Sequence, residues 1–156
     1  MVQVFLYDVT KRVVVRTIQT NKDAVYRVAW NPRDATLLAC AGQDGNCVVT
    51  RVNGQVQRVL KHAKPVFGCA WSPFETATIA TACGDGNVYV WHIAKPDDAA
   101  KPWATLVGHK AKVFNVAWSP LLPDMLLSGS DDRTARVWRV SNKDCQVRWD
   151  RIRTAV

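Results

Sequence analysis

The sequence predicts an all-β fold built from repeated four-stranded antiparallel sheets, and three observations lead to this class. A register of four positions recurs three times with gaps of nineteen, four and six residues. Each copy also contains a break of tryptophan, polar residue and proline, and two of the three contain an Asp-Gly turn. Self-similarity at spacings of 41 and then 47 residues between these tryptophans is typical of a repeat protein. The register positions are Asn21, Cys40, Asp44 and Thr50; His62, Thr81, Asp85 and Trp91; and His109, Ser128, Asp132 and Trp138.

The first strand of each repeat is expected just before the proline break, in the runs VYRVAW, VFGCAW and VFNVAW. β-Branched and aromatic residues dominate these runs, as they do in strands. Few polar residues interrupt them, so we expect both faces of each first strand to be buried. The prolines that follow, Pro32, Pro73 and Pro120, cannot continue a sheet ladder and therefore end the strands.

The second and third strands are expected to form a hairpin in each repeat. The second strands are predicted at residues 36–40, 77–81 and 125–128, and the third strands at CVVTRV, VYVWHI and ARVWRV. The turns between them read QDGN, GDGN and DDRT. An Asp-Gly pair between apolar runs is a strong hairpin signal, because glycine accepts the positive φ of a tight turn. Arg133 replaces that glycine in the third repeat.

Weaker apolar runs at residues 56–60 and 103–107 predict a fourth strand in the first two repeats. Residues 2–8 and 13–17 predict the third and fourth strands of a preceding sheet. The stretch 94–102, AKPDDAAKP, is expected to be a solvated loop and accounts for the longer second spacing. No segment shows a convincing helical period.

The runs GHKAKVFNVAWSP and LLSGSDDRTARVW together resemble a WD repeat of the β-propeller superfamily. The Gly-His pair of such repeats stands at residues 108–109, whereas the Trp-Asp pair survives only in part, as Trp-Arg at 138–139 and Trp-His at 91–92. The resemblance spans residues 2–140 and implies blades of four antiparallel strands. The expected fold class is therefore all-β, with WD-repeat β-propeller blades.

About three and a half blades are expected, which makes a partial propeller, since closed rings typically need about four to eight blades. We expect one domain in four parts. Residues 1–20 are the C-terminal half of a preceding blade, 21–61 a degenerate first WD repeat, 62–107 the second repeat, and 108–156 the third repeat with a truncated tail. Open blade faces would leave aromatic surface in water, so self-association through open blade edges is one expected partnership.

The resemblance implies a structural hydrogen-bond network in the second and third repeats. In WD repeats the aspartate accepts from histidine, histidine from the hydroxyl, and the hydroxyl from the indole N–H. The members here are His62, Thr81, Asp85 and Trp91, and His109, Ser128, Asp132 and Trp138. Serine, histidine and aspartate also make hydrolase triads, but no G-x-S-x-G turn is present, so we expect no catalytic residue and no enzyme. The first repeat lacks both histidine and indole, and we expect apolar packing to hold it.

The composition, 48% hydrophobic and 22% charged, is typical of a globular protein, and no apolar run approaches the roughly eighteen residues of a membrane span. The first residues do not resemble a signal peptide, and we expect an intracellular protein, cytoplasmic or nuclear. Five cysteines form no C-x-x-C pair, so reduced, buried thiols are expected rather than disulfides or a metal site. No cofactor is expected, because no phosphate-binding loop or dinucleotide fingerprint occurs.

A net charge of +8 raises the alternative of a basic-surface module that binds RNA or DNA. The densest basic stretch holds Arg133, Arg136, Arg139, Lys143, Arg148, Arg151 and Arg153. Arginines at outward positions of edge strands also protect those edges, and we expect that role for Arg136 and Arg139. No RNA-binding signature accompanies them. Nucleic acid is therefore the less favoured partner, and no membrane partner is expected.

The favoured function is a non-catalytic scaffold for protein–protein interaction that presents a rim of loops to other proteins. The loops that lead into the first strands carry Lys22, Lys64, Lys110 and Lys112, a candidate rim for an acidic peptide. An ordinary solvated lysine face is the simpler interpretation of the same four residues.

Overall fold

The computed structural model describes residues 2–94, 101–141 and 144–149, the last segment as backbone only, and the regular structure in these residues is all β-strand. The strands are β1 (Gln3–Asp8), β2 (Val13–Gln19), β3 (Val25–Trp30), β4 (Leu37–Gly42), β5 (Asn46–Arg51), β6 (Val56–Lys61), β7 (Val66–Trp71), β8 (Thr78–Cys83), β9 (Val88–His92), β10 (Ala104–Leu106), β11 (Val113–Trp118), β12 (Met125–Ser130), β13 (Ala135–Arg139) and β14 (Asp144–Trp149). The all-β prediction is confirmed. Within the described ranges, no helix has the length and apolar character needed to cross a membrane.

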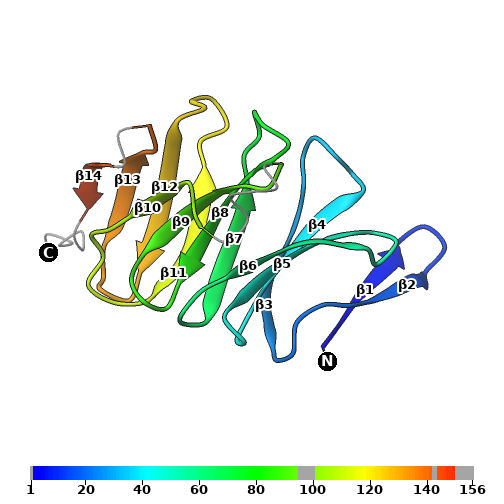
Figure 1. The fold of residues 1–156 in the computed structure, drawn as a ribbon. Coiled ribbons are helices and arrows are strands. Elements are labelled where there is room, and N and C mark those ends of the chain that lie inside the picture. Colours follow the sequence, from blue (N-terminus) through cyan, green and yellow to red (C-terminus); the bar gives the residue numbers. More distant parts are fainter. Residues whose placement is uncertain (1, 95–100, 142–143, 150–156) are drawn as a thin grey trace, which may run out of the picture.

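The strands form three antiparallel sheets of four, β3–β6, β7–β10 and β11–β14, and one sheet of two, β1–β2. Within each larger sheet the strands follow chain order, as expected of blades built from successive hairpins. Figure 1 shows the sheets side by side, from the blue N-terminal hairpin to the C-terminal sheet, whose strands run from yellow to red. The first strands β3, β7 and β11 contact one another in sequence. The sheets make an incomplete ring, so the molecule is a partial propeller.

Two seams hold the three larger sheets together. We call the interface between sheets β3–β6 and β7–β10 the first seam, and that between β7–β10 and β11–β14 the second seam. At each seam, apolar side chains from the facing sheets form one buried cluster. The indole N–H of Trp71 donates to the Ala29 carbonyl across the first seam (3.1 Å), and that of Trp118 donates to the Ala70 carbonyl across the second (3.0 Å). The recurring tryptophan therefore links neighbouring sheets as well as filling the core.

The two-stranded sheet β1–β2 packs on the outer face of sheet β3–β6. Ile18 of β2 is buried against Leu38 and Cys40 of β4, and Val4 and Leu6 of β1 pack around them. Residues 3–8 and 13–19 form an antiparallel pair, and their assignment to the C-terminal half of a preceding blade stays a prediction. The strand β14, which pairs with β13 and completes the third repeat, was not predicted from the sequence. Of the expected loop at 94–102, residues 95–100 lie outside the described residues.

The prediction that both faces of every first strand are buried is right for β7 and wrong for β3 and β11. β7 lies between the other two first strands and is buried or half-buried throughout. Val28 and Trp30 of β3 are 43% and 53% exposed, and Phe114 of β11 is 46% exposed. Within the described residues, β3 and β11 each have a four-stranded sheet on one side only. Apolar side chains of both strands are therefore exposed to solvent.

The Asp-Gly turns adopt the positive φ that the sequence predicts, 76° at Gly45 and 92° at Gly86. These glycines also permit a close approach between repeats. A Cβ at Gly45 would lie 2.9 Å from the His62 carbonyl oxygen, and one at Gly86 would lie 3.1 Å from the His109 carbonyl oxygen. Arg133, at the same position in the third repeat, is an exposed residue with φ of 66°.

Candidate functional site

The third repeat joins its four register residues into one chain of hydrogen bonds. The indole N–H of Trp138 donates to Ser128 Oγ (2.8 Å), and Ser128 Oγ lies 2.8 Å from His109 Nε2. His109 Nδ1 lies 2.9 Å from Asp132 Oδ2. A carboxylate only accepts, so Nδ1 carries the proton, and Nε2 of the neutral ring accepts from the Ser128 hydroxyl. The chain ties the loop before β11 to β12, to β13 and to the turn between them.

The Asp132 carboxylate is the most heavily bonded group of this network. It accepts from the Thr134 hydroxyl (2.6 Å), the Thr134 N–H (3.0 Å) and the Lys110 N–H (2.9 Å), besides His109. The side chains of His109 and Asp132 are only 1% and 7% exposed. Burial alone would raise the pKa of Asp132, but the bonds from Thr134, Lys110 and His109 outweigh burial and lower it. The aspartate therefore stays ionised and holds both loop and turn.

The second repeat departs from the expected network at its aspartate. His62 Nε2 lies 2.8 Å from Thr81 Oγ1, which also accepts from the Trp91 indole (3.0 Å). His62 Nδ1, however, donates to the carbonyls of Leu60 (3.1 Å) and Gly45 (3.3 Å).

Asp85 instead accepts from the Tyr89 hydroxyl at 2.5 Å and from the Asn87 N–H at 2.9 Å. Tyr89 lies four residues further along the chain, near the start of β9, and its hydroxyl reaches back to the turn. Asp85 is exposed, unlike Asp132. The expectation of four linked residues in this repeat is therefore wrong at Asp85, because Tyr89 competes for the carboxylate.

The first repeat uses a shorter polar link where apolar packing alone was expected. The Asn21 side-chain N–H₂ donates to Asp44 Oδ1 and to the Asn46 carbonyl, both at 3.0 Å. Asp44 Oδ2 accepts from the Lys22 N–H at 2.8 Å. Asn21 is buried, and its own Oδ1 is one of the few buried polar atoms among the described residues without a partner. The sequence signal for this polar link is Asn21 itself, which stands at the position that histidine occupies in the other two repeats.

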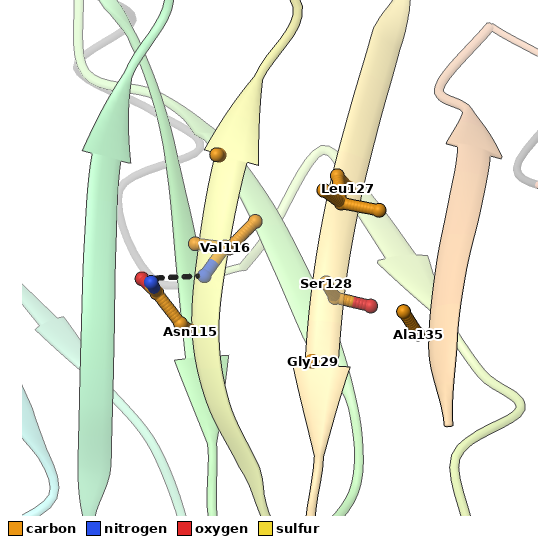
Figure 2. Close-up of a pocket in the computed structure, with 7 residues that line it drawn as sticks. Asn115, Val116, Leu127, Ser128, Gly129 and Ala135 are labelled. Atoms are coloured by element: carbon orange, nitrogen blue, oxygen red, sulfur yellow. Dashed lines mark hydrogen bonds between the residues drawn. The ribbon is translucent and has the colours of Figure 1, made fainter. Parts of the chain in front are cut away.

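Ser128 lies beside a hollow of about 210 Å³ on the open face of the last sheet, which Figure 2 shows with Leu127, Gly129 and Ala135. A hydrolase would need the serine oxygen free to attack a substrate there. Ser128 Oγ is instead held between His109 and Trp138, and the residue is 1% exposed. The geometry fits a structural link and not a nucleophile open to substrate.

The rim that leads into the first strands carries a row of aromatic rings that was not predicted from the sequence. Tyr26, Phe67 and Phe114 are the second residues of β3, β7 and β11. The Tyr26 and Phe67 rings stack with centroids 5.1 Å apart, and the Phe67 and Phe114 rings meet edge to face at 5.3 Å. Tyr26 and Phe114 are each 46% exposed, and the Tyr26 hydroxyl bonds to the side chain of Gln43 in the neighbouring turn. The sequence signal that could have predicted this row is an aromatic residue at the second position of every first strand.

The four candidate lysines are exposed on the same rim. Lys22 and Lys110 occupy equivalent positions, and their backbone N–H groups hold the turn aspartates described above. Lys64 and Phe67 both lie close to Gly84, because a Cβ there would meet the Phe67 ring at 3.2 Å and Lys64 Cβ at 3.5 Å. Lys112 immediately precedes β11. The four lysines therefore lie in the loops that lead into the first strands, next to the strands that carry the aromatic row.

The described arginines of the basic C-terminal stretch differ in exposure, since Arg133 and Arg139 are exposed and Arg136 is buried. Arg136 is 8% exposed and lies over the Trp138 ring, 5.8 Å from its centroid. β13 pairs with β12 and β14, so the expectation that Arg136 and Arg139 protect an edge strand is wrong. The side chain of Arg148, and the whole of Lys143, Arg151 and Arg153, lie outside the described residues.

The described cysteines are buried and form no disulfide. Cys40, Cys47, Cys69 and Cys83 are free thiols. Burial raises the pKa of Cys40 to about 12 and that of Cys83 to about 11, which keeps both protonated and unreactive. The side chain of Cys145 lies outside the described residues. Among the residues that the structure describes, no three His, Cys, Asp or Glu side chains form a group able to hold a metal ion.

A family model described as "WD domain, G-beta repeat" matches residues 12–50, 54–92 and 100–139. The three matched units correspond to strands β2–β5, β6–β9 and β10–β13. Each unit therefore combines the last strand of one sheet with the first three strands of the next. The matches cover well over half of the chain.

Proposed function

This chain belongs to the WD-repeat family, whose members generally act as scaffolds for protein–protein interaction, and we propose that it binds an acidic peptide segment on its aromatic and lysine-bearing rim. We call this surface the aromatic rim, and its residues are Lys22, Tyr26, Lys64, Phe67, Lys110, Lys112 and Phe114. The peptide anchors an apolar side chain on the rings, and its carboxylates face the surrounding lysines.

The row of rings is the observation that carries the proposal. Exposed aromatic residues are enriched at protein interfaces, because they bury large apolar area with little loss of conformational freedom. Three consecutive first strands contribute one ring each, and the rings contact one another, so their exposed surfaces are continuous. Exposure of 46% at both ends of the row leaves this surface accessible. Contact between the rings also fixes their orientation before a partner binds.

The positive charge of the lysines favours a negatively charged partner. Exposed ammonium groups attract carboxylates over roughly 10 Å at moderate salt and speed encounter more than they add affinity. We therefore expect the rings to set the dissociation rate and the lysines to set the association rate and its salt dependence.

The test measures binding of a panel of labelled peptides by fluorescence anisotropy, with leucine or phenylalanine flanked by aspartate and glutamate. Phe114→Ala should weaken binding of any hit about tenfold. The control is Leu121→Ala, a residue 83% exposed in the loop after β11, at the opposite end of that strand. A double charge reversal, Lys64→Glu with Lys112→Glu, should slow association about tenfold, whereas Lys11→Glu, in the β1–β2 turn, should not.

The nucleic-acid alternative is separated in the same assay by salt. A single-stranded RNA and a duplex DNA of matched length replace the peptides. Affinity set by phosphate contacts falls by orders of magnitude between about 50 and 200 mM salt, whereas an apolar anchor is much less sensitive. Peptide binding that survives Phe114→Ala, or tighter salt-sensitive binding of the oligonucleotides, would remove the acidic-peptide proposal.

We also propose that the chain self-associates through its open sheet faces. Leu127 of β12 is 44% exposed, whereas Ala80, at the same place in β8, is fully buried in the second seam. At the other end of the molecule, Trp30 is 53% exposed, whereas its equivalent Trp71 is buried. The two ends therefore expose the surfaces that elsewhere pack together.

Light scattering after size exclusion, at two protein concentrations, tests this association. The wild-type chain should gain mass with concentration, and Leu127→Asp should remain a monomer. Leu121→Asp, a more exposed leucine in a loop, is the matched control and should behave as wild type. A monomeric wild-type chain at every concentration would contradict the proposal.

We propose, finally, a relationship within the family. The run CVVTRVNGQVQRVLKHAKPVFGCAWSP places Thr50 and Arg51 where tryptophan and aspartate are usual. In this it resembles the later repeats of WD repeat-containing protein 17. An alignment in which repeats of other WD proteins reproduce this degenerate pair equally well would remove the distinction.

A further inference from the structure

A cleft opens at the second seam on the rim opposite the aromatic rim, and we propose that it binds a cationic side chain of a partner protein, an arginine by preference. The cleft has a volume of about 250 Å³. It lies where β7 has ended at Trp71 and the loop to β8 begins, whereas Lys64 precedes β7 at the opposite end. Ligand and location therefore both differ from those of the aromatic rim.

At the equivalent place on the first seam, two side chains of this chain bond across the seam. Asn31, just after β3, donates across the seam to the Thr76 carbonyl at 2.7 Å. Two residues on, Arg33 Nη1 donates across it to the Pro73 carbonyl at 3.3 Å. The first seam is thus closed on this rim by an amide and a guanidinium that belong to the chain itself.

The second seam lacks both groups. Ser72 takes the place of Asn31, and its Oγ is used within its own loop, where it accepts from the N–H groups of Phe74 (3.2 Å) and Glu75 (3.3 Å). Phe74 takes the place of Arg33 and is 37% exposed. Neither side chain donates across the seam, and the cleft lies at this point.

The walls of the cleft suit a flat cation. Trp103 is 43% exposed, and its ring packs against the His92 ring with centroids 4.9 Å apart. Phe74 supplies a second aromatic wall. A guanidinium stacks on indole and gains both electrostatic and dispersion energy, which is why arginine exceeds lysine in such contacts.

The charges of the cleft are negative although the chain as a whole carries +8. Glu75 and Asp124 line it from opposite sides of the seam, and none of its ten lining residues is lysine or arginine. Glu75 accepts from the Thr78 hydroxyl, which also meets His92 Nδ1 at 2.8 Å. Asp124 is held by the Ser141 N–H and hydroxyl, at 2.7 and 2.6 Å. Both carboxylates are therefore fixed in place before a cation arrives.

The experiment is a titration of the ¹⁵N-labelled chain, followed by the indole N–H signals in NMR spectra. The probe is the capped tripeptide Gly-Arg-Gly, compared with Gly-citrulline-Gly, its neutral isostere, and Gly-Lys-Gly. Trp103→Phe identifies the Trp103 signal. The arginine peptide should shift that signal in a saturable way, with about fivefold weaker binding for citrulline and intermediate binding for lysine. The buried indoles of Trp91 and Trp138 should not move and report that the fold is intact.

Three variants sharpen the test. Glu75→Gln should weaken arginine binding about threefold, whereas Asp131→Asn, an exposed aspartate on the opposite rim, should leave it unchanged. Phe74→Arg introduces at the second seam the residue type that Arg33 provides at the first seam, and this variant should not bind the arginine peptide. Phe74→Met should retain most of the binding. Equal binding of arginine and citrulline, an unmoved Trp103 signal, or undiminished binding by Phe74→Arg would each overturn the proposal.

Discussion

The first and third repeats place different side chains at the same register, yet both close the loop before the first strand onto the turn aspartate. Lys22 N–H bonds to Asp44 at 2.8 Å, and Lys110 N–H bonds to Asp132 at 2.9 Å. The third repeat then continues inward through a histidine to a serine and a tryptophan, whereas Asn21 ends the first-repeat link. The contact common to both is therefore between backbone and aspartate, and the inner part of the network varies.

The largest difference is expected between His109→Ala and Asn21→Ala. His109→Ala removes the buried link between Ser128 and Asp132, each of which keeps its other partners, and it opens a cavity, so we expect a loss of about 3 kcal/mol. Asn21→Ala removes the hydrogen bonds to Asp44 and to the Asn46 carbonyl, but its unpartnered Oδ1 disappears as well, so we expect a loss of about 1 kcal/mol. Urea unfolding followed by tryptophan fluorescence measures both. Equal losses would mean that the inner part of the network contributes nothing.

A second comparison sets the turn aspartates of the second and third repeats against each other. Asp132→Asn removes a buried carboxylate that accepts from His109, Thr134 and Lys110, and should destabilise the chain by about 2 kcal/mol. Asp85→Asn changes an exposed group and should cost about 0.5 kcal/mol. The same unfolding assay applies. A larger loss for Asp85→Asn would show that the tyrosine-held aspartate matters more than the histidine-held one.

Acid should destabilise the two repeats in different pH ranges. Burial lowers the pKa of His62, and the bonds to the Gly45 and Leu60 carbonyls offset this only in part. Its contribution is therefore complete above about pH 6.5 and is lost as pH falls through the folded-state pKa. The pKa of Asp132 is also lowered, since its hydrogen bonds outweigh burial, so its contribution is complete above about pH 3.9 and lost in stronger acid.

Unfolding midpoints between pH 3 and 8 test these ranges. His62→Gln should flatten the curve just below about pH 6.5, and Asp132→Asn should flatten it only below about pH 4. Wild type, measured in parallel, should show both slopes. If Asp132→Asn instead changed the slope near pH 6, the assignment of the two ranges would be reversed.

Much of the fold could be predicted from the sequence, because the signals concerned are local. The Asp-Gly turns, the proline breaks and the apolar runs each act within a few residues, so strand positions followed directly. The exposure of Trp30 and the burial of Trp71 could not be predicted in the same way, since the two stand in the same motif. Their difference depends on how many sheets lie beside each strand.

Side-chain competition limited the prediction of the site. Asp85 has the residue type and spacing of Asp132, but it accepts from the Tyr89 hydroxyl and not from a histidine. The aromatic rim could have been found from Tyr26, Phe67 and Phe114, which share one position in their strands. The cleft at the second seam could not be predicted from the sequence. It is present because neither Ser72 nor Phe74 makes a hydrogen bond across that seam.

The last comparison is between the equivalent turn positions of the second and third repeats, Gly86 and Arg133. Gly86→Ala would force a side chain to φ of 92° and place its Cβ 3.1 Å from the His109 carbonyl oxygen, so we expect a loss of about 1–2 kcal/mol. Arg133→Gly relieves a φ of 66° at an exposed turn and should stabilise the chain by about 0.5 kcal/mol, since the greater freedom of glycine in the unfolded chain offsets part of the relief. Thermal unfolding measures both, with Gly54→Ala as a control, because its φ is also positive, at 90°, but no atom lies within 4 Å of its Cβ position. If Gly54→Ala cost as much as Gly86→Ala, backbone strain alone would explain the glycine, and the approach of the next repeat would not matter.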